Sequence, residues 1–481
     1  MKHGHQEPSR RTAAALITAL ALIIMQPGFA APEPDQHLNP FEAIRTFDQV
    51  WEQVRDQYFD YARLAPVWEE ARAELRPQAE QAETITELRT LLAGLLERIG
   101  ESHFAVLPAE FMNRLDALPG QENQHSRQFR PASTGLGVRL VDDRVRVTAV
   151  RRDSPAWLAG IRHGWEVVAV DDHDFNDMLT DLTIAEGADE VRRAQLMLEI
   201  GLQGLLTFPE AGRELVLTVI DQQNRSHQVK FSGATTHIEL IQLGNLPPMA
   251  LEWHLDRLQR EDHCVMQLAF SSWVPALNEA LRQRRDELLQ CAGLVIDLRG
   301  NLGGVITTMV TLGADLFDHP TTLGSLVRAD GQVDFRVLPR RVAMDGRRLE
   351  PFDGPIAILI DRLSASTSEM FAGGMQASGR ARLFGETSAG MALPGQMLPL
   401  ASGDVLMYAF ADYRDSSGRR IEGIGVVPDV TAPPLGSNPD SEIDEPLAKA
   451  LSWIERELSG STPTAASHRP ETSEIPGPSV H

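Results

Sequence analysis

Lysine is scarce in this sequence. Only Lys2, Lys230 and Lys449 occur among 45 basic residues, and arginine supplies the remainder. No lysine lies between Lys230 and Lys449, a stretch of almost half the chain. A reaction centre that needs a catalytic lysine therefore has three candidates.

Cysteine is nearly absent as well. With only Cys264 and Cys291, a metal site built from three or four thiolates is excluded. Each cysteine precedes an apolar run typical of a core strand, so the two either pair in an oxidising compartment or remain small buried residues. The histidines lack clustered metal-ligand spacing, and no His-Glu-x-x-His pattern occurs. We expect no metal and no cofactor.

Positive charge is in deficit. The chain holds 45 basic and 67 acidic residues, a formal net charge of -22 at pH 7. Such a chain repels the phosphate backbone of nucleic acids and anionic lipid surfaces. We therefore expect no nucleic-acid partner, although the charge says little about the chemistry.

Long apolar runs are also missing. Residues 12–25 form an apolar run too short for a comfortable bilayer span, and they follow Arg10 and Arg11. Gly28-Phe29-Ala30 then offers small residues at a cleavage site, which predicts an export signal over residues 1–30. An uncleaved anchor is the alternative. We expect a periplasmic or secreted protein with no stable membrane span after the signal is removed.

The 481 residues are too many for one core, because domains usually hold roughly 100–200 residues. Apolar side chains recur at helical spacing within residues 40–115, and residues 116–133 are polar like a linker, so 31–133 is predicted as an N-terminal helical region. Residues 134–232 are rich in predicted strands. An α/β unit over 233–435 and a helix over 436–458 follow. The tail, 459–481, is rich in Ser, Thr and Pro and is predicted to be disordered.

The α/β prediction rests on three compact apolar runs of the kind that form buried strands. These runs are Val265–Phe270, Leu294–Leu298 and Ile356–Ile360. Helical segments separate them at 275–290, 305–317 and 366–378. The alternation of strands and helices predicts an α/β fold for this unit.

Ser366 is the first candidate for chemistry. It lies where the strand ending at Ile360 gives way to a helix, so free backbone N–H groups and the helix dipole favour an anion beside it. That is a suitable place for a nucleophile and a developing oxyanion. The alternative is structural, since Ser366 and Glu369 also fit a capping box.

A glycine-rich turn is the second candidate. Asp297-Leu298-Arg299-Gly300-Asn301-Leu302-Gly303-Gly304 follows a buried strand, and its glycines let backbone amides approach a ligand. A tight strand-to-helix turn and a phosphate-binding loop fit the segment equally well, although the P-loop ending Gly-Lys-Ser/Thr is absent.

The two segments together, in this order, resemble the carboxyl-terminal (tail-specific) processing peptidases. In that family the middle serine of a Ser-Ala-Ser-x-Ser-Glu segment is the nucleophile, and here that serine is Ser366. The resemblance also covers Gly385–Gly390 and a PDZ-like unit at 134–232. It implies a ClpP/crotonase-like catalytic core with a mixed β-sheet and helices, beside an N-terminal helical region and a β-rich PDZ-like domain.

One departure selects a branch of the family. Many members activate the serine with a lysine shortly after the Gly-Glu-Thr segment, but this chain has Met391 there. The other branch resembles the tricorn protease core, which pairs the serine with a histidine on a Ser-His segment and with a late glutamate. Ser102, His103 and Glu422 match those places.

The resemblance implies roles for these residues. His103 would be the base for Ser366, with Glu422 orienting it directly or through Ser102. The Thr367 amide and an amide at Gly303 or Gly304 would form the oxyanion hole. Amides at Gly135, Leu136, Gly137 and Val138 would receive the carboxylate of a peptide that adds as a strand.

The implied function is a serine endopeptidase that cleaves unfolded or C-terminally exposed proteins by acyl transfer. Its partners would be protein or peptide substrates engaged by the C-terminus; the sequence carries no signal for an oligomeric state. The alternatives are a non-catalytic PDZ scaffold or an apolar-ligand-binding protein on the same fold. Hydrolysis of a non-peptide ester or amide is a third, because acyl-transfer enzymes share this chemistry.

Overall fold

A computed structural model describes residues 37–109, 130–171, 173–175, 188–236, 238–241, 249–260, 262–343, 345–435 and 443–460. The predicted export signal lies outside these ranges. Within them, no helix is both long enough and apolar enough to cross a bilayer.

The N-terminal part is helical, as its periodicity predicts. The helices are α2 (Pro40–Gln57), α3 (Tyr61–Ala79) and α4 (Ile85–Glu97). They bury Phe47, Trp51 and Trp68 in a shared core. Strand β1 (Ala105–Leu107) follows and pairs with β17 (Val405–Ala409), which pairs in turn with β16 (Gly395–Pro399). The segment just before β1 is thereby fixed against the C-terminal half of the chain.

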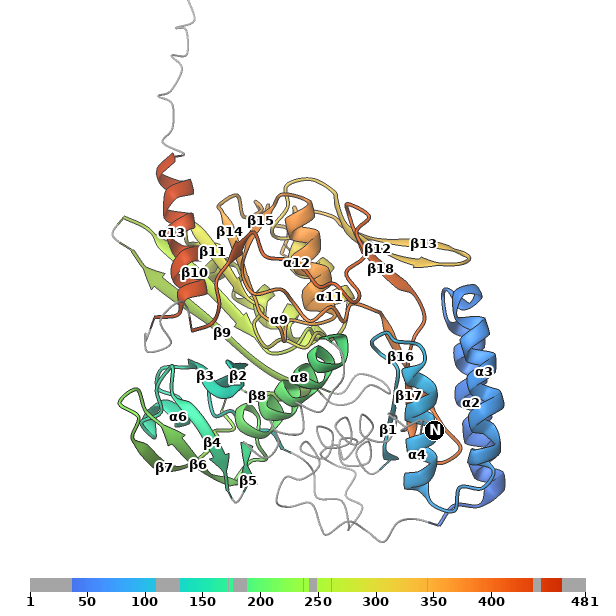
Figure 1. Cartoon of the computed structure of the whole chain (residues 1–481). Helices are drawn as coiled ribbons and strands as arrows, with labels where there is room; N and C mark the ends of the chain where they lie inside the picture. Colours follow the sequence, from blue (N-terminus) through green and yellow to red (C-terminus); the bar gives the residue numbers. More distant parts are fainter. Residues whose placement is uncertain are drawn as a thin grey trace, which may run out of the picture.

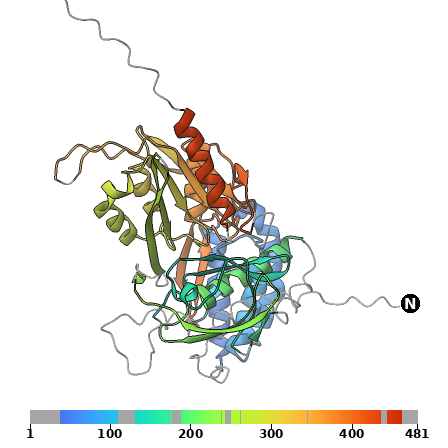
Figure 2. The same ribbon diagram turned by 90° about the vertical axis from the view of Figure 1, so that its left-hand side faces the viewer.

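A β-rich unit comes next. Its strands pair in the order β2-β3-β4-β6-β7, with β5 added beside β4. Their bounds are β2 (Leu136–Val141), β3 (Arg144–Val150), β4 (Glu166–Val170), β5 (His173–Asp174), β6 (Glu214–Ile220) and β7 (Ser226–Ser232). The helices are α6 (Pro155–Leu158) and α8 (Ala188–Leu202), and α8 continues into a π-helical turn, η1 (Gln203–Thr207). The unit lies below the central sheet in Figures 1 and 2.

The central sheet has seven strands in the order β19-β15-β14-β11-β10-β9-β8. The first five run parallel, β9 pairs antiparallel with β10, and β8 pairs antiparallel with β9, so the predicted mixed α/β fold is confirmed. The bounds are β19 (Val430–Thr431), β15 (Ala381–Gly385), β14 (Ile356–Ile360), β11 (Gly293–Asp297), β10 (Cys264–Phe270), β9 (Met249–Gln259) and β8 (Ile238–Ile241).

Helices cover both faces of this sheet because successive strand residues point to opposite sides. On β11, Leu294 and Ile296 pack with the core that includes α12 (Thr367–Ala377), whereas Val295 packs with α13 (Glu445–Gly460). Figure 1 shows α12 and α13 flanking the strands. Three more helices of the described residues are α9 (Pro275–Gln283), α10 (Arg285–Leu288) and α11 (Thr307–Gly313).

Two details differ from the sequence prediction. Helix α13 continues to Gly460, where the tail was predicted to begin at Ser459, and the Ser459 hydroxyl donates to the Glu455 carbonyl (2.7 Å) in its last turn. A three-stranded sheet of β13 (Gly331–Val337), β12 (Thr321–Arg328) and β18 (Asp412–Asp415) was not predicted. The β13 strand of that sheet is largely exposed, so it lacks the compact apolar run that marks a core strand.

Cys264 and Cys291 form a disulfide, which settles the alternative left open by the sequence. It joins the first residue of β10 to the turn before β11 across a sequence separation of 27. We expect the double replacement Cys264→Ser and Cys291→Ser to lower the free energy of unfolding by about 3–4 kcal/mol, because the unfolded chain gains loop entropy. Urea unfolding measures this. Reductant should destabilise the wild type by a similar amount and leave the variant unchanged; equal effects on both would contradict the prediction.

The strand order creates the site. Strands β11 and β14 are parallel neighbours, with Leu294 opposite Ile356 and Asp297 opposite Leu359. Their carboxyl ends therefore meet at one edge of the sheet, where ligand sites of parallel sheets usually lie. The glycine-rich turn after β11 and the Ser366 segment after β14 consequently leave the sheet side by side.

Candidate active site

Ser366 stands at the turn where β14 has ended and α12 begins. Its backbone has φ 54° and ψ −120°, a conformation that costs an L-residue on the order of 1–3 kcal/mol. The Ser366 N–H donates to the Met391 carbonyl (2.9 Å) and to Glu369 Oε2 (3.2 Å), which holds it there. The capping pattern predicted from Ser366 and Glu369 is present. It does not exclude catalysis, since a nucleophilic serine commonly occupies a strained strand-to-helix turn.

The glycine pair predicted for the oxyanion hole lies directly against the serine. Gly303 has φ +103°, and a Cβ added to it would stand 2.6 Å from Ser366 Cβ and 3.1 Å from the Thr367 nitrogen. No residue but glycine fits such a close approach. Thr367 Oγ1 donates to the Gly304 carbonyl (2.8 Å), which ties the two loops together. The Gly303 N–H donates to Asn301 Oδ1 (2.9 Å), so it is already engaged.

The three residues of the predicted base assembly meet although they are far apart in the sequence. Ser102 N–H donates to Glu422 Oε1 (2.7 Å) and Ser102 Oγ donates to Glu422 Oε2 (3.0 Å). Ser102 Oγ is also 2.8 Å from His103 Nδ1. Because the hydroxyl gives its proton to a carboxylate, its oxygen accepts from Nδ1–H. This assignment leaves Nε2 of His103 unprotonated and able to take a proton. We call Glu422, Ser102 and His103 the relay.

Burial sets the charge state of the relay. It lowers the pKa of His103 to about 4, so the imidazole is neutral near pH 7 and can act as a base. Burial also raises the pKa of Glu422, which three hydrogen bonds from Ser102 and Ala392 oppose.

Glu101 anchors the segment that carries the histidine. Its carboxylate receives hydrogen bonds from Arg420 (2.8 Å), Arg63 (2.9 Å) and the Tyr58 hydroxyl (2.8 Å). Arg63 and Tyr58 belong to the N-terminal helical part, whereas Arg420 lies two residues before Glu422. Contacts of Glu101 with both parts thus hold Ser102 and His103 between the N-terminal helices and the α/β core. This anchor was not recognised in the sequence.

One peptide unit, Met391–Ala392, joins the nucleophile to the relay. The Met391 carbonyl accepts from Ser366 N–H (2.9 Å), and the Ala392 N–H donates to Glu422 Oε2 (2.8 Å). A few residues on, Gly395 lies so near the imidazole that an added Cβ would be 3.1 Å from His103 Cδ2. Residues 391–395 therefore run from the serine to the histidine.

Neither lysine of the described residues offers an alternative base. Lys449 is on α13, where its Nζ is paired with Glu445 (2.6 Å), and Lys230 is on β7 of the β-rich unit. Among the described ranges, no cluster of three or more His, Cys, Asp or Glu side chains is arranged to hold a metal ion.

Of the predicted peptide-binding residues, Gly135 lies directly before β2 and the other three begin the strand. Gly135 has φ +69°, and its N–H donates to Ser133 Oγ (3.2 Å). At Leu136, the N–H donates to Thr134 Oγ1 (3.1 Å) and the carbonyl accepts from Thr207 Oγ1 (2.7 Å). Polar groups at the start of this strand are therefore paired with side chains of the same unit.

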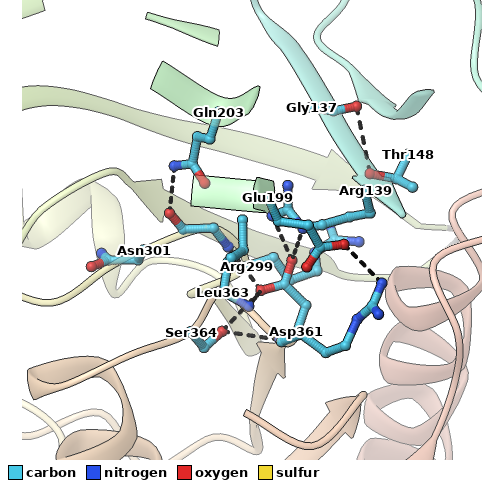
Figure 3. Close-up of polar contacts among 12 residues, drawn as sticks. Gly137, Arg139, Thr148, Glu199, Gln203, Arg299, Asn301, Asp361, Leu363 and Ser364 are labelled. Atoms are coloured by element: carbon cyan, nitrogen blue, oxygen red, sulfur yellow. Dashed lines mark hydrogen bonds and ion pairs between the residues drawn. The ribbon is translucent and has the colours of Figure 1, made fainter. Parts of the chain in front are cut away.

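A buried ion pair connects the β-rich unit to both loops of the site (Figure 3). Arg139 on β2 donates to Asp361 Oδ2 (2.6 and 2.9 Å), and both side chains are buried. Asp361 Oδ1 accepts from the Gly300 and Leu363 N–H groups, each at 3.0 Å. Gln203 of η1 adds a hydrogen bond to the Gly300 carbonyl (2.7 Å). One carboxylate thus orders the turn after β11 and the turn before Ser366.

Sequence reasoning missed Arg139 and Asp361 as site-shaping residues. Asp361 carried a usable signal, because an acidic residue directly after a buried strand can accept the free N–H groups of the turn. Arg139 carried none, since its partner lies 222 residues away.

Comparisons with known proteins show what this chain is similar to. Residues 266–432 match peptidase family S41. The chain is 27% identical over 416 residues to the chloroplastic C-terminal processing peptidase of Tetradesmus obliquus, covering 84% of this chain and 80% of that protein. It is 22% identical over 384 residues to a carboxyl-terminal-processing protease of Synechocystis sp., covering 79% of each. The structure of mature CPAF has the same fold, with a TM-score of 0.52, 14% identity and coverage of 87% and 96%.

Proposed function

From the match of residues 266–432 to peptidase family S41, we propose that this chain is a serine endopeptidase of that family with Ser366 as nucleophile and His103 as base. The observation that carries the assignment is the Met391–Ala392 peptide, which binds Ser366 on one side and Glu422 of the relay on the other.

The first step is attack on a peptide carbonyl. His103 Nε2 takes the proton from Ser366 Oγ as the oxygen bonds to the carbonyl carbon. The imidazolium that forms is stabilised through Nδ1–H, which donates to Ser102 Oγ, while the Ser102 hydroxyl donates to Glu422. The negative charge of Glu422 therefore acts on His103 through one hydroxyl.

The tetrahedral intermediate needs donors for its oxyanion. We assign the amides of Thr367 and Gly304 to this role, because the Gly303 N–H is engaged by Asn301. Each such donor is worth about 10²–10³ in rate. His103 then protonates the leaving amine, and a water molecule, activated by the same base, hydrolyses the acyl-enzyme.

We further propose that substrates are unfolded or C-terminally exposed proteins. Two relatives are named as carboxyl-terminal processing enzymes, which supports this substrate class. In the proposal, a substrate C-terminus meets the amides of Gly135–Val138 and adds as a strand to β2. Such a strand replaces the hydrogen bonds of Leu136 with Thr134 and Thr207.

The proposed location is the periplasm or the exterior of the cell. The disulfide between Cys264 and Cys291 supports it, since disulfides persist mainly in oxidising compartments. The export signal predicted at residues 1–30 also supports this location.

The test is cleavage of an unfolded model protein by residues 31–481, with the products read by mass spectrometry. We expect cuts that a serine-directed fluorophosphonate abolishes, and an adduct on Ser366. Absence of both cleavage and labelling, together with tight binding of a peptide or an apolar ligand, would instead favour a scaffold or binding protein on this fold.

A further inference from the structure

The Glu369 carboxylate lies behind the nucleophile, in the first turn of α12, and is fully buried. Its Oε1 accepts from Ser388 Oγ (2.6 Å) and Gly390 N–H (2.7 Å). Its Oε2 accepts from Met391 N–H (2.8 Å) and Ser366 N–H (3.2 Å). An ionised carboxylate has about four lone-pair sites, so its accepting capacity is filled.

These four donors come from the segments that build the site. Ser388, Gly390 and Met391 belong to residues 388–392, which we call the bridging segment. Met391 and Ala392 donate their consecutive N–H groups to two different carboxylates, Glu369 and Glu422. One carboxylate holds the nucleophile, and the other belongs to the relay.

The bridging segment also fixes the chain that carries Glu422. Ser388 Oγ accepts from the Val426 N–H (2.6 Å), and the Gly390 carbonyl accepts from the Gly423 N–H (2.9 Å). A shift of the Glu369 contacts would therefore move Ser366 and Glu422 relative to each other.

We infer that Glu369 is a positioning residue for peptide cleavage. Its ionised carboxylate fixes the position of Ser366 relative to the relay, because it binds both the nucleophile and the bridging segment. This inference rests on the proposed function. It adds a second acidic residue with a role distinct from that of Glu422.

The ionised form is required because every partner donates. Three are N–H groups, and the Ser388 hydroxyl gives its proton to Glu369 while its oxygen takes the Val426 N–H. A proton added to Glu369 would need an acceptor, and the three N–H groups offer none. Protonation therefore displaces at least one donor, and the position of Ser366 relative to the relay becomes less fixed.

The surroundings make that protonation accessible. Burial, with the negative charge of Glu422 as a smaller contribution, raises the pKa of Glu369 to about 7 against the opposing hydrogen bonds. No arginine, lysine or histidine of the described chain forms an ion pair with it. On β18, which packs on α12, Asp412 and Asp415 are paired with Arg420 (2.8 Å) and Arg419 (3.0 Å).

The charged side chains of the other two strands packed on α12 point elsewhere. On β15, Arg382 lies over the Trp453 ring, 6.0 Å from its centroid. On β12, Arg328 pairs with Asp330 (3.1 Å). Glu422 is thus the charged neighbour that contributes to the raised pKa of Glu369.

The test is the rate at which a fluorophosphonate labels Ser366 between pH 5 and 9. In the wild type we expect a plateau above pH 8 and a fall of about tenfold from that plateau at pH 6, one unit below the pKa of Glu369. Burial lowers the pKa of His103 to about 4, below the range of this fall, and the Glu369→Gln variant separates the two groups.

Two variants should change the profile in different ways. Glu369→Gln cannot ionise, so its plateau rate should fall by about 10–10²-fold and the fall near pH 7 should vanish. Ser388→Ala removes a hydrogen bond that lowers the pKa of Glu369, so the fall should move to higher pH. If Glu369→Gln fails to fold, as judged by circular dichroism, the Ser388→Ala shift alone decides the matter.

Glu386→Gln is the matched control. Glu386 is a half-buried carboxyl whose pKa burial also raises, but it faces Arg362 (3.7 Å) rather than the bridging segment. The control should keep the wild-type profile. A fall near pH 7 that persists in Glu369→Gln, or that moves in Glu386→Gln, overturns the inference. A wild type that labels equally fast from pH 5 to 9 overturns it while leaving the proposed function intact, whereas no labelling at any pH counts against the function itself.

Discussion

Replacing Ser366 with alanine is expected to lower kcat for peptide cleavage by about 10⁶-fold, since loss of the nucleophile in a serine protease removes the covalent route. The fold should survive, because the hydrogen bonds from the Ser366 N–H to Met391 and Glu369 do not depend on the side chain that is removed. A residual rate about 10³–10⁴ above that of water is expected from the oxyanion hole and binding. Initial rates on a fluorogenic peptide measure the loss, and circular dichroism checks the fold.

Ser378 supplies the matched control for this variant. It ends the same helix that Ser366 begins, and its hydroxyl bonds only the Met375 carbonyl (3.1 Å) among the described residues. Ser378→Ala should retain wild-type rates and fluorophosphonate labelling. Cleavage that persists in a folded Ser366→Ala protein would show that another residue is the nucleophile.

The sequence predicts the central sheet well because its strands are continuous apolar runs. Strands β10, β11 and β14 fall within one residue of the runs at 265–270, 294–298 and 356–360. The same argument does not predict the small sheets. Strands β16 and β13 are largely exposed, so their residues lack a period that distinguishes a strand from a loop.

The site could be predicted only as separate pieces. Ser102 and Glu422 are 320 residues apart, and no local pattern shows that they touch; the family resemblance supplied that pairing. Glu369 illustrates a different difficulty. A capping box explains its place three residues after Ser366, and the capping contact exists, yet the same carboxylate also binds Gly390 and Met391, which only the folded chain brings near.

The division into domains stays a prediction, because the family match covers residues 266–432 alone. The physical contacts nevertheless limit how independent the units can be. The pair of Arg139 and Asp361 is buried on both sides, so removing either partner leaves an uncompensated charge. The β-rich unit therefore contributes to the order of the two site loops, whatever ligand it binds.

Replacing His103 should cost nearly as much as replacing Ser366, a fall in kcat of about 10⁴–10⁶-fold, because the hydroxyl loses the base that takes its proton. The choice of substitute matters, since His103 has φ 61° and asparagine adopts this left-handed region more readily than alanine. His103→Asn is accordingly the cleaner variant, with His103→Ala beside it. Initial rates and a melting curve are the measurements, and full activity in either folded variant would contradict the base assignment.

The relay also predicts how the losses of activity in Glu422 and Ser102 variants compare with the loss in the His103 variant. Glu422→Gln should cost less than His103→Asn, because the carboxylate acts on the imidazole through the Ser102 hydroxyl and not by direct contact. Ser102→Ala removes the hydroxyl that links Glu422 to His103. The hydrogen bonds of Glu422 with the Ser102 and Ala392 N–H groups remain, so Glu422 should keep its place. If the two residues form one path, the double variant should lose hardly more activity than the worse single variant. Losses that multiply would mean that Glu422 supports His103 by a route that bypasses Ser102.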